Sequence, residues 1–74
     1  MKQINFYEVS KNGDVSWGGA DPITAVKWFR DSIDNSLFVS IWDEEDPEEP
    51  KMVVDKIDIS SVVLATILSE RERG

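Results

Sequence analysis

The sequence predicts an α+β fold, a two-layer sandwich in which a four-stranded antiparallel sheet carries two helices on one face. Three observations predict it: two β-rich stretches around an Asn-Gly pair, a helix start at Asp21-Pro22, and two further β-rich stretches around an acidic run. They give the element order β-β-α-β-β-α. A right-handed crossover after the second strand places the third strand beside the first, so the expected strand order is 2-1-3-4 with antiparallel neighbours.

The first hairpin is predicted from residues 2–17. Residues 2–9 are rich in β-branched and aromatic side chains, which favour a strand. Asn12-Gly13 favours positive φ in a hairpin turn, and residues 15–17 then form a short return strand that Gly18-Gly19 ends. Trp17, at the end of this strand, is expected in the core.

The first helix has the clearest start signal in the chain. Asp21 can accept hydrogen bonds from the first free amides, and Pro22 supplies a preset φ at the first helical position. We expect a helix from Pro22 to about Ile33 whose apolar face consists of Pro22, Val26, Phe29 and Ile33. Trp28 lies about 130° from the centre of that stripe, so it is expected to flank the core or to be exposed.

The second hairpin begins with a stretch that is apolar on both faces. Residues 37–42 place Leu37, Val39 and Ile41 on one face and Phe38 and Trp42 on the other, which is typical of a strand in the middle of a sheet. Residues 52–57 form the fourth strand. The sheet face away from the helices, carrying some of Tyr7, Phe38 and Trp42, is expected to be open unless a second subunit covers it.

The last helix is expected to be capped by Asp58 or Ser60. Its apolar face consists of Val63, Leu64, Ile67 and Leu68. Residues 69–74 are expected to fray into solvent.

Length and composition predict a single domain over residues 1–74, near the lower size limit for a hydrophobic core that folds unaided. Without cysteine there is no disulfide, so the apolar 41% of the chain must hold the fold alone or with a second subunit, and a homodimer is among the expected assemblies. Residues 1–5 lack the apolar run of a signal peptide, and no stretch approaches the ~20 apolar residues that span a bilayer. We expect a cytoplasmic protein with no membrane partner.

The charge of the chain is concentrated in one run. Fifteen acids against eight bases give a net charge of −7, and removing the six acids of this run leaves nine against eight. The run consists of Asp43, Glu44, Glu45, Asp46, Glu48 and Glu49, with two prolines. Such a patch repels nucleic acid, and it can attract a basic partner or simply keep a loop soluble. The basic residues are scattered, so we expect no direct nucleic-acid binding.

Most catalytic chemistry is excluded by composition. The chain has no histidine and no cysteine, so histidine-assisted nucleophiles and histidine or thiolate metal sites cannot form. Carboxylates on a solvated loop have nothing to raise their pKa for acid-base work. The acidic run also lacks the glycine turn and alternate-residue spacing of a calcium-binding loop. We therefore expect no enzyme, no catalytic residue, no cofactor and no specific metal site.

Four segments carry a resemblance to a known group of proteins: Gly18-Gly19-Ala20-Asp21-Pro22, Ala25-Val26-Lys27-Trp28-Phe29, Val39-Ser40-Ile41-Trp42-Asp43 and Val63-Leu64-Ala65-Thr66-Ile67. Together they resemble the small uncharacterised proteins of actinobacterial phages and prophages. The composition, low in alanine and arginine, departs from what such genomes usually encode. The resemblance implies a small non-enzymatic protein that acts by binding.

The leading functional hypothesis is a protein-protein interaction module. Exposed aromatic residues are over-represented in binding hot spots, and carboxylates can steer a basic partner. The expected contacts are Trp28, Phe38, Trp42, Asp43, Glu44, Glu45, Asp46, Glu48 and Glu49. Two alternatives stay open: an acidic nucleic-acid mimic that inhibits a DNA-binding protein, and a structural or assembly subunit that associates with itself.

Overall fold

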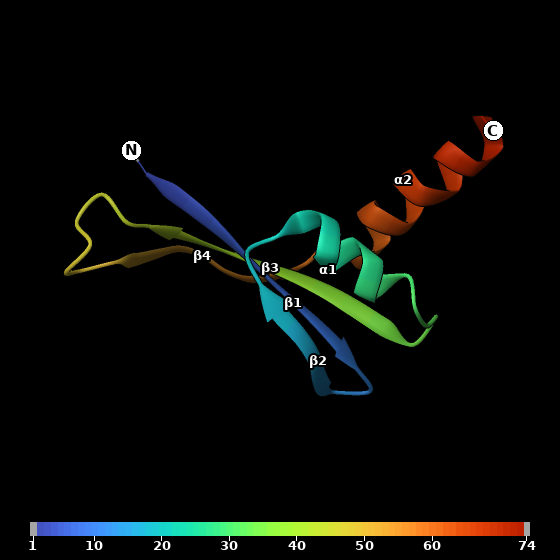
Figure 1. Ribbon diagram of the computed structural model, residues 1–74, viewed down its shortest axis with the longest axis horizontal. Helices are drawn as coiled ribbons and strands as arrows, with labels where there is room; N and C mark the ends of the chain where they lie inside the picture. The colour runs from blue at the N-terminus through green and yellow to red at the C-terminus, as the bar shows by residue number, and fades with distance from the viewer. Residues whose placement is uncertain (1, 74) are drawn as a thin grey trace.

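Four strands form one antiparallel sheet in the order β2-β1-β3-β4, and two helices pack on one of its faces (Figure 1). The computed structural model describes residues 2–73, and the side chains of residues 2–70. The elements are β1 (Gln3–Lys11), β2 (Asp14–Gly19), α1 (Pro22–Phe29), β3 (Asn35–Asp43), β4 (Lys51–Asp58) and α2 (Ser60–Arg73). The predicted fold class and strand order are confirmed.

The β1–β2 hairpin closes through the two-residue turn that the sequence predicts. Asn12 and Gly13 have φ angles of 53° and 87°, and Lys11 pairs with Asp14. Positive φ at both central positions matches the right-handed twist of the strands, which is why Asn-Gly is favoured there. The strand then continues through Gly18-Gly19, where a Cβ on Gly19 would lie 2.8 Å from the Trp17 indole. This glycine lets the indole fold against the chain.

The central position predicted for the third strand is confirmed. β3 pairs with β1 over its whole length, from Asn35 opposite Lys11 to Asp43 opposite Gln3, and with β4 on its other side. The β3–β4 register shifts twice, and at one irregularity Lys56 adopts a φ of 36°. The acidic run forms the loop of this second hairpin.

α1 begins as predicted and ends four residues earlier than predicted. Asp21 is the N-cap, and its Oδ1 accepts the Ile23 N–H at 3.0 Å. The helix ends at Phe29 because the Asn35 side-chain amide donates to the carbonyl oxygens of Trp28 and Phe29, at 2.9 and 3.3 Å. Ile33 therefore lies in the following loop, 98% exposed, and its predicted place in the apolar face is wrong.

The core is small and lies under α1. Among the described side chains, four apolar ones are buried: Val9, Ala25, Phe29 and Leu37. Five more are partly buried against them: Tyr7, Trp17, Ile59, Val63 and Ile67. The predicted core position of Trp17 is confirmed, whereas Tyr7 faces the helices and not the open face of the sheet.

α2 begins with a cap from Asp58, one of the two residues predicted for that role. The Asp58 Oδ1 accepts the Ser60 N–H at 2.9 Å, while the Ser60 hydroxyl accepts the Leu37 N–H at 2.8 Å. The predicted apolar face is only half right, because Leu64 and Leu68 remain about half exposed. The helix also continues to Arg73 through residues expected to fray, and Gly74 lies outside the described residues.

The molecule is elongated, with extents of 44 × 29 × 17 Å and a radius of gyration of 13.7 Å. A compact domain of this length would have a radius of about 11 Å. Both helices cluster over the half of the sheet that contains Val9 and Leu37. Figure 1 shows the other half, with the start of β1 and the β3–β4 loop, extending beyond the helices. We call it the bare half.

Truncating Phe29 should unfold a large fraction of the protein. Phe29 is 7% exposed in the core, so Phe29→Ala should cost about 3–5 kcal/mol of unfolding free energy. Trp28→Ala is the matched control, since Trp28 is 43% exposed and should cost about 1 kcal/mol. Urea denaturation followed by circular dichroism measures both. Equal losses would mean that Trp28 carries as much of the packing as Phe29.

The cap of α1 should make stability depend on pH. Hydrogen bonds from the Thr24 hydroxyl and from the Ile23 N–H lower the pKa of Asp21. A carboxylate whose pKa is lower in the folded state contributes stability above its unfolded pKa of about 4, and this contribution is lost as pH falls through the folded value. Asn caps a helix equally well without titrating. The melting temperature of the wild type should therefore fall relative to that of Asp21→Asn as the pH drops below about 4.

Thr24→Val supplies the control for that titration. It removes the 2.6 Å hydrogen bond from the Thr24 hydroxyl to Asp21 Oδ2, the largest cause of the lowered pKa. In the Thr24→Val background, the Asp21→Asn substitution should change the pH profile less. The four proteins are wild type, the two single variants and the double variant. If their melting temperatures change in parallel from neutral pH to below pH 4, Asp21 is not the group that makes stability depend on pH.

Candidate functional site

The sheet face away from the helices is defined by the register of β1 and β3. Ile4 lies opposite Trp42, and Glu8 lies opposite Phe38. Directly opposed residues share a face, and successive residues alternate, so these side chains point away from the core. Met52 of β4 lies opposite Trp42 and extends the same face. We call its five apolar residues the open face: Ile4, Phe6, Phe38, Trp42 and Met52.

The open face is an apolar surface that crosses three strands. Phe6 and Met52 are exposed, and Ile4, Phe38 and Trp42 are half-buried. Neither helix covers it, because both pack on the opposite face. A group of apolar residues on one face of a small protein marks a binding surface more often than isolated exposed apolar residues do.

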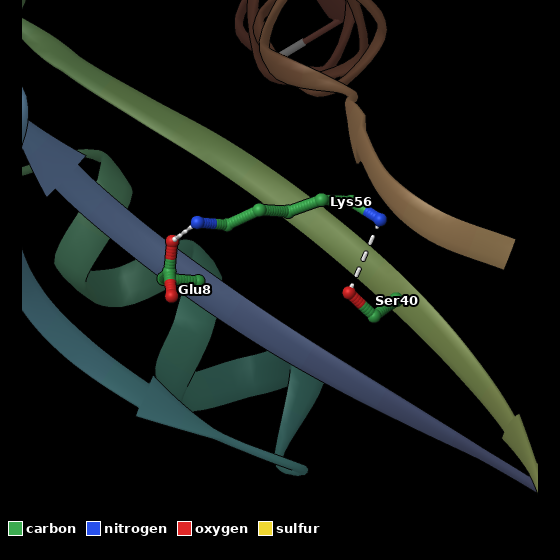
Figure 2. A network of polar contacts seen from close by, with 3 residues as sticks. All are labelled: Glu8, Ser40 and Lys56. Atoms are coloured by element: carbon green, nitrogen blue, oxygen red, sulfur yellow. Dashed lines mark hydrogen bonds and ion pairs between the residues drawn. The ribbon is translucent and has the colours of Figure 1, made fainter. Parts of the chain in front are cut away.

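One polar bridge crosses this face (Figure 2). The Lys56 side chain extends from β4 over β3, and its Nζ lies 2.6 Å from Glu8 Oε2 on β1. The same Nζ lies 5.7 Å from the centroid of the Phe38 ring, and the Lys56 N–H donates to Ser40 Oγ at 3.2 Å. An exposed ion pair stabilises by only about 0.2–1 kcal/mol. The bridge matters more for the shape of the surface: it lies over the Phe38 ring and does not cover Trp42.

The acidic loop borders the open face, because Asp43 follows Trp42 directly. Its two aspartates hold the loop: Asp43 Oδ1 accepts the Glu45 N–H at 3.0 Å, and Asp46 Oδ1 accepts the Glu48 N–H at 3.1 Å. The Glu44 N–H donates to the Lys2 carbonyl oxygen at 2.8 Å. Within the described residues, the side chains of the four glutamates make no hydrogen bond or ion pair. Their charges therefore face solvent.

The loop encloses no metal centre within the described residues, where no three carboxylates converge closely enough to hold an ion. A shallow hollow of about 260 Å³ lies there, lined by Asp43, Glu45, Asp46, Glu49 and Lys51. A larger hollow, about 660 Å³, runs along α1, and its charged groups are Lys27, Arg30 and Asp31.

The structure separates the predicted contact residues into two groups. Phe38, Trp42 and the acidic loop lie together on or beside the open face. Trp28 lies on α1, across the sheet from them, beside a hollow lined by Thr24, Lys27, Trp28 and Asp31. Its predicted exposure is confirmed, while its role in an interface stays a prediction.

Several residues of the open face do not stand out in the sequence: Ile4, Phe6 and Met52, with the Glu8–Lys56 bridge. Ile4 and Phe6 alternate with Tyr7 and Val9, so a face could be assigned to them once Val9 is known to be buried. Met52 could not be assigned in this way. The register shift between Ile41 and Trp42 decides its face, and nothing in the sequence marks that shift.

Comparison of the chain with family models, with curated proteins and with solved structures finds no match. The resemblance to phage and prophage proteins therefore stays a prediction. No helix among the described residues combines the length and the apolar content needed to cross a bilayer. The site must be interpreted from its own residues.

The glutamates of the acidic loop should be dispensable for folding. Like charges within a Debye length of ~8 Å repel one another, and these side chains have no partner within the described residues. Replacing Glu44, Glu45, Glu48 and Glu49 with Gln should leave the melting temperature unchanged or raise it in low salt. Asp46→Ala is the contrasting variant, since it removes a loop hydrogen bond. A clear loss of stability in the Gln variant would show that the glutamates are paired.

Proposed function

We propose that this chain is a non-enzymatic protein-binding module whose open face takes up an apolar segment flanked by basic residues. The observation that carries the proposal is that an aromatic surface lies directly beside a loop of solvated carboxylates. The absence of histidine and cysteine from the sequence supports a role that needs no catalytic chemistry.

The apolar part of the surface supplies the affinity in this proposal. Trp42 and Phe6 offer large, rigid contact areas of the kind that dominate binding energy in protein interfaces. Trp42 is half-buried between strands, so its ring is held in place before a partner arrives. Such preorganisation lowers the entropy cost of association.

The acidic loop supplies selectivity and speed. Its glutamates stand at the border of the apolar surface, unpaired within the described residues. Complementary charge raises association rates and disfavours partners of like charge. A partner with basic residues beside its apolar segment therefore fits this surface better than a neutral or acidic one.

Nucleic-acid mimicry is supported less well. A mimic needs carboxylates spread along a surface in the manner of phosphates. Here the six clustered carboxylates occupy one loop at one end of an elongated molecule. The apolar surface beside them would have no part in imitating a phosphate backbone.

Selection of peptides from a random display library on the immobilised full chain tests the proposal. We expect enriched peptides with Lys or Arg on either side of aliphatic or aromatic residues. Their affinity, measured by fluorescence anisotropy, should fall at least about 30-fold for Trp42→Ser, as for a lost hot-spot aromatic. It should also fall with added salt and in the four-Gln loop variant.

Trp28→Ser is the matched control, because it removes the same residue type from the other side of the sheet and should leave affinity unchanged. Equal binding by wild type and folded Trp42→Ser would overturn the proposal, as would enriched peptides without basic residues. The nucleic-acid mimic would be favoured by a different result: binding that depends on the loop alone and that a short DNA duplex reproduces in place of the chain.

A further inference from the structure

Among the described residues, the contacts that hold α2 to the rest of the molecule come from residues 59–67. The Ile59 N–H donates to the Leu37 carbonyl oxygen at 2.9 Å, and Val63 and Ile67 pack against the core. Figure 1 shows the helix extending away from the sheet toward its C-terminal end. An isolated helix of 14 residues is marginal in water, so α2 depends on tertiary packing for its stability.

The outer side of α2 is apolar and borders a groove. Leu64 and Leu68 are 48% and 49% exposed, and Ile33 on the facing loop is almost fully exposed. Phe29, Ile67 and these three side chains are among the residues that line a groove of about 420 Å³. Arg30 is its one charged lining residue among the described residues.

The exposed area of the whole chain leaves room for one interface of ordinary size. The chain exposes 5580 Å², whereas a folded monomer of 8.4 kDa exposes about 4,600 Å². The excess is about 1,000 Å², and a stable protein interface buries about 800 Å² from each partner. One interface of ordinary size would bring the exposed area to the value expected for this mass.

The pattern on α2 fits a second copy of the same helix. Its exposed residues Ser61, Leu64, Ala65 and Leu68 follow the i, i+3, i+4, i+7 spacing of a helix-helix seam. Small residues in that seam allow close approach of two helices about 21 Å long. Because the acidic loop lies at the other end of the molecule, two chains of charge −7 can meet here with their loops far apart.

We infer that the chain forms a two-fold symmetric dimer in which α2 of each copy packs antiparallel on α2 of the other, with Ile33 at the margin. The same patch then serves both copies, as an isologous interface requires. The open face is not part of this contact and remains free for a partner. The inference therefore does not depend on the proposed function.

Sedimentation velocity of the full chain over a range of concentrations tests the dimer. Wild type should reach a mass of about twice 8.4 kDa, and Leu68→Lys should weaken association at least about 100-fold, because two unpaired lysines would be buried. Val62→Lys is the matched control: Val62 lies on the same helix, is 69% exposed and stands outside the seam. It should leave the association constant within a factor of about three.

Ile33→Lys provides a second variant that the folded monomer should accommodate, since Ile33 is outside the core; it should weaken association about tenfold. Trp42→Ser, which alters only the open face, should dimerise like wild type. A wild type that stays monomeric at every concentration would overturn the inference. So would equal effects of Val62→Lys and Leu68→Lys, or a dimer that both Leu68→Lys and Ile33→Lys leave intact.

Discussion

Two residues at the start of β3, Asn35 and Leu37, hold both helices to the sheet. The Asn35 side chain caps the end of α1, while the Leu37 backbone accepts the Ile59 N–H and donates to the Ser60 hydroxyl at the start of α2. The Leu37 side chain is also one of the four buried in the core. The cap of α1, the backbone hydrogen bonds to α2 and a core side chain therefore all lie at the same end of β3. Both helices pack at that end.

This clustering leaves the sheet unevenly covered. Fully burying a Val, Leu or Phe stabilises by about 1.5–3 kcal/mol, and among the described residues Val9, Leu37 and Phe29 are the large side chains of the buried core. The molecule is 44 Å long, and both of its helices pack at one end of the sheet. They cannot cover the other end. The bare half is a direct consequence, and the hydrogen bonds of β1 with β3 extend into it down to Gln3 opposite Asp43.

The uneven cover also separates two surfaces of different chemistry. The open face and acidic loop combine aromatic rings with solvated carboxylates, which suits a basic, apolar partner. The outer side of α2 is apolar with little charge, which suits contact between identical chains. In the proposed dimer the acidic loops lie far from the two-fold contact. Two binding surfaces in one particle would raise avidity for a repetitive partner.

The sequence by itself determined the order of elements, the turn at Asn12-Gly13, the start of α1 at Asp21 and the central position of β3. These features depend on residues close together in the chain, such as a cap and the amides it accepts. It also determined that the carboxylates form one loop and that Trp28 is exposed. The exclusion of histidine and cysteine chemistry follows from composition alone and does not depend on the fold.

Only the tertiary structure decided where α1 ends, because its last carbonyls are capped by Asn35 from the next strand and Ile33 is thereby left in solvent. Only the structure turned Tyr7 toward the helices and placed Met52 beside Trp42. It also left Leu64 and Leu68 exposed, although they share a helix with Val63 and Ile67. The physical reason is the same in each case: a side chain's face is fixed by register and packing against distant residues, which local periodicity does not encode.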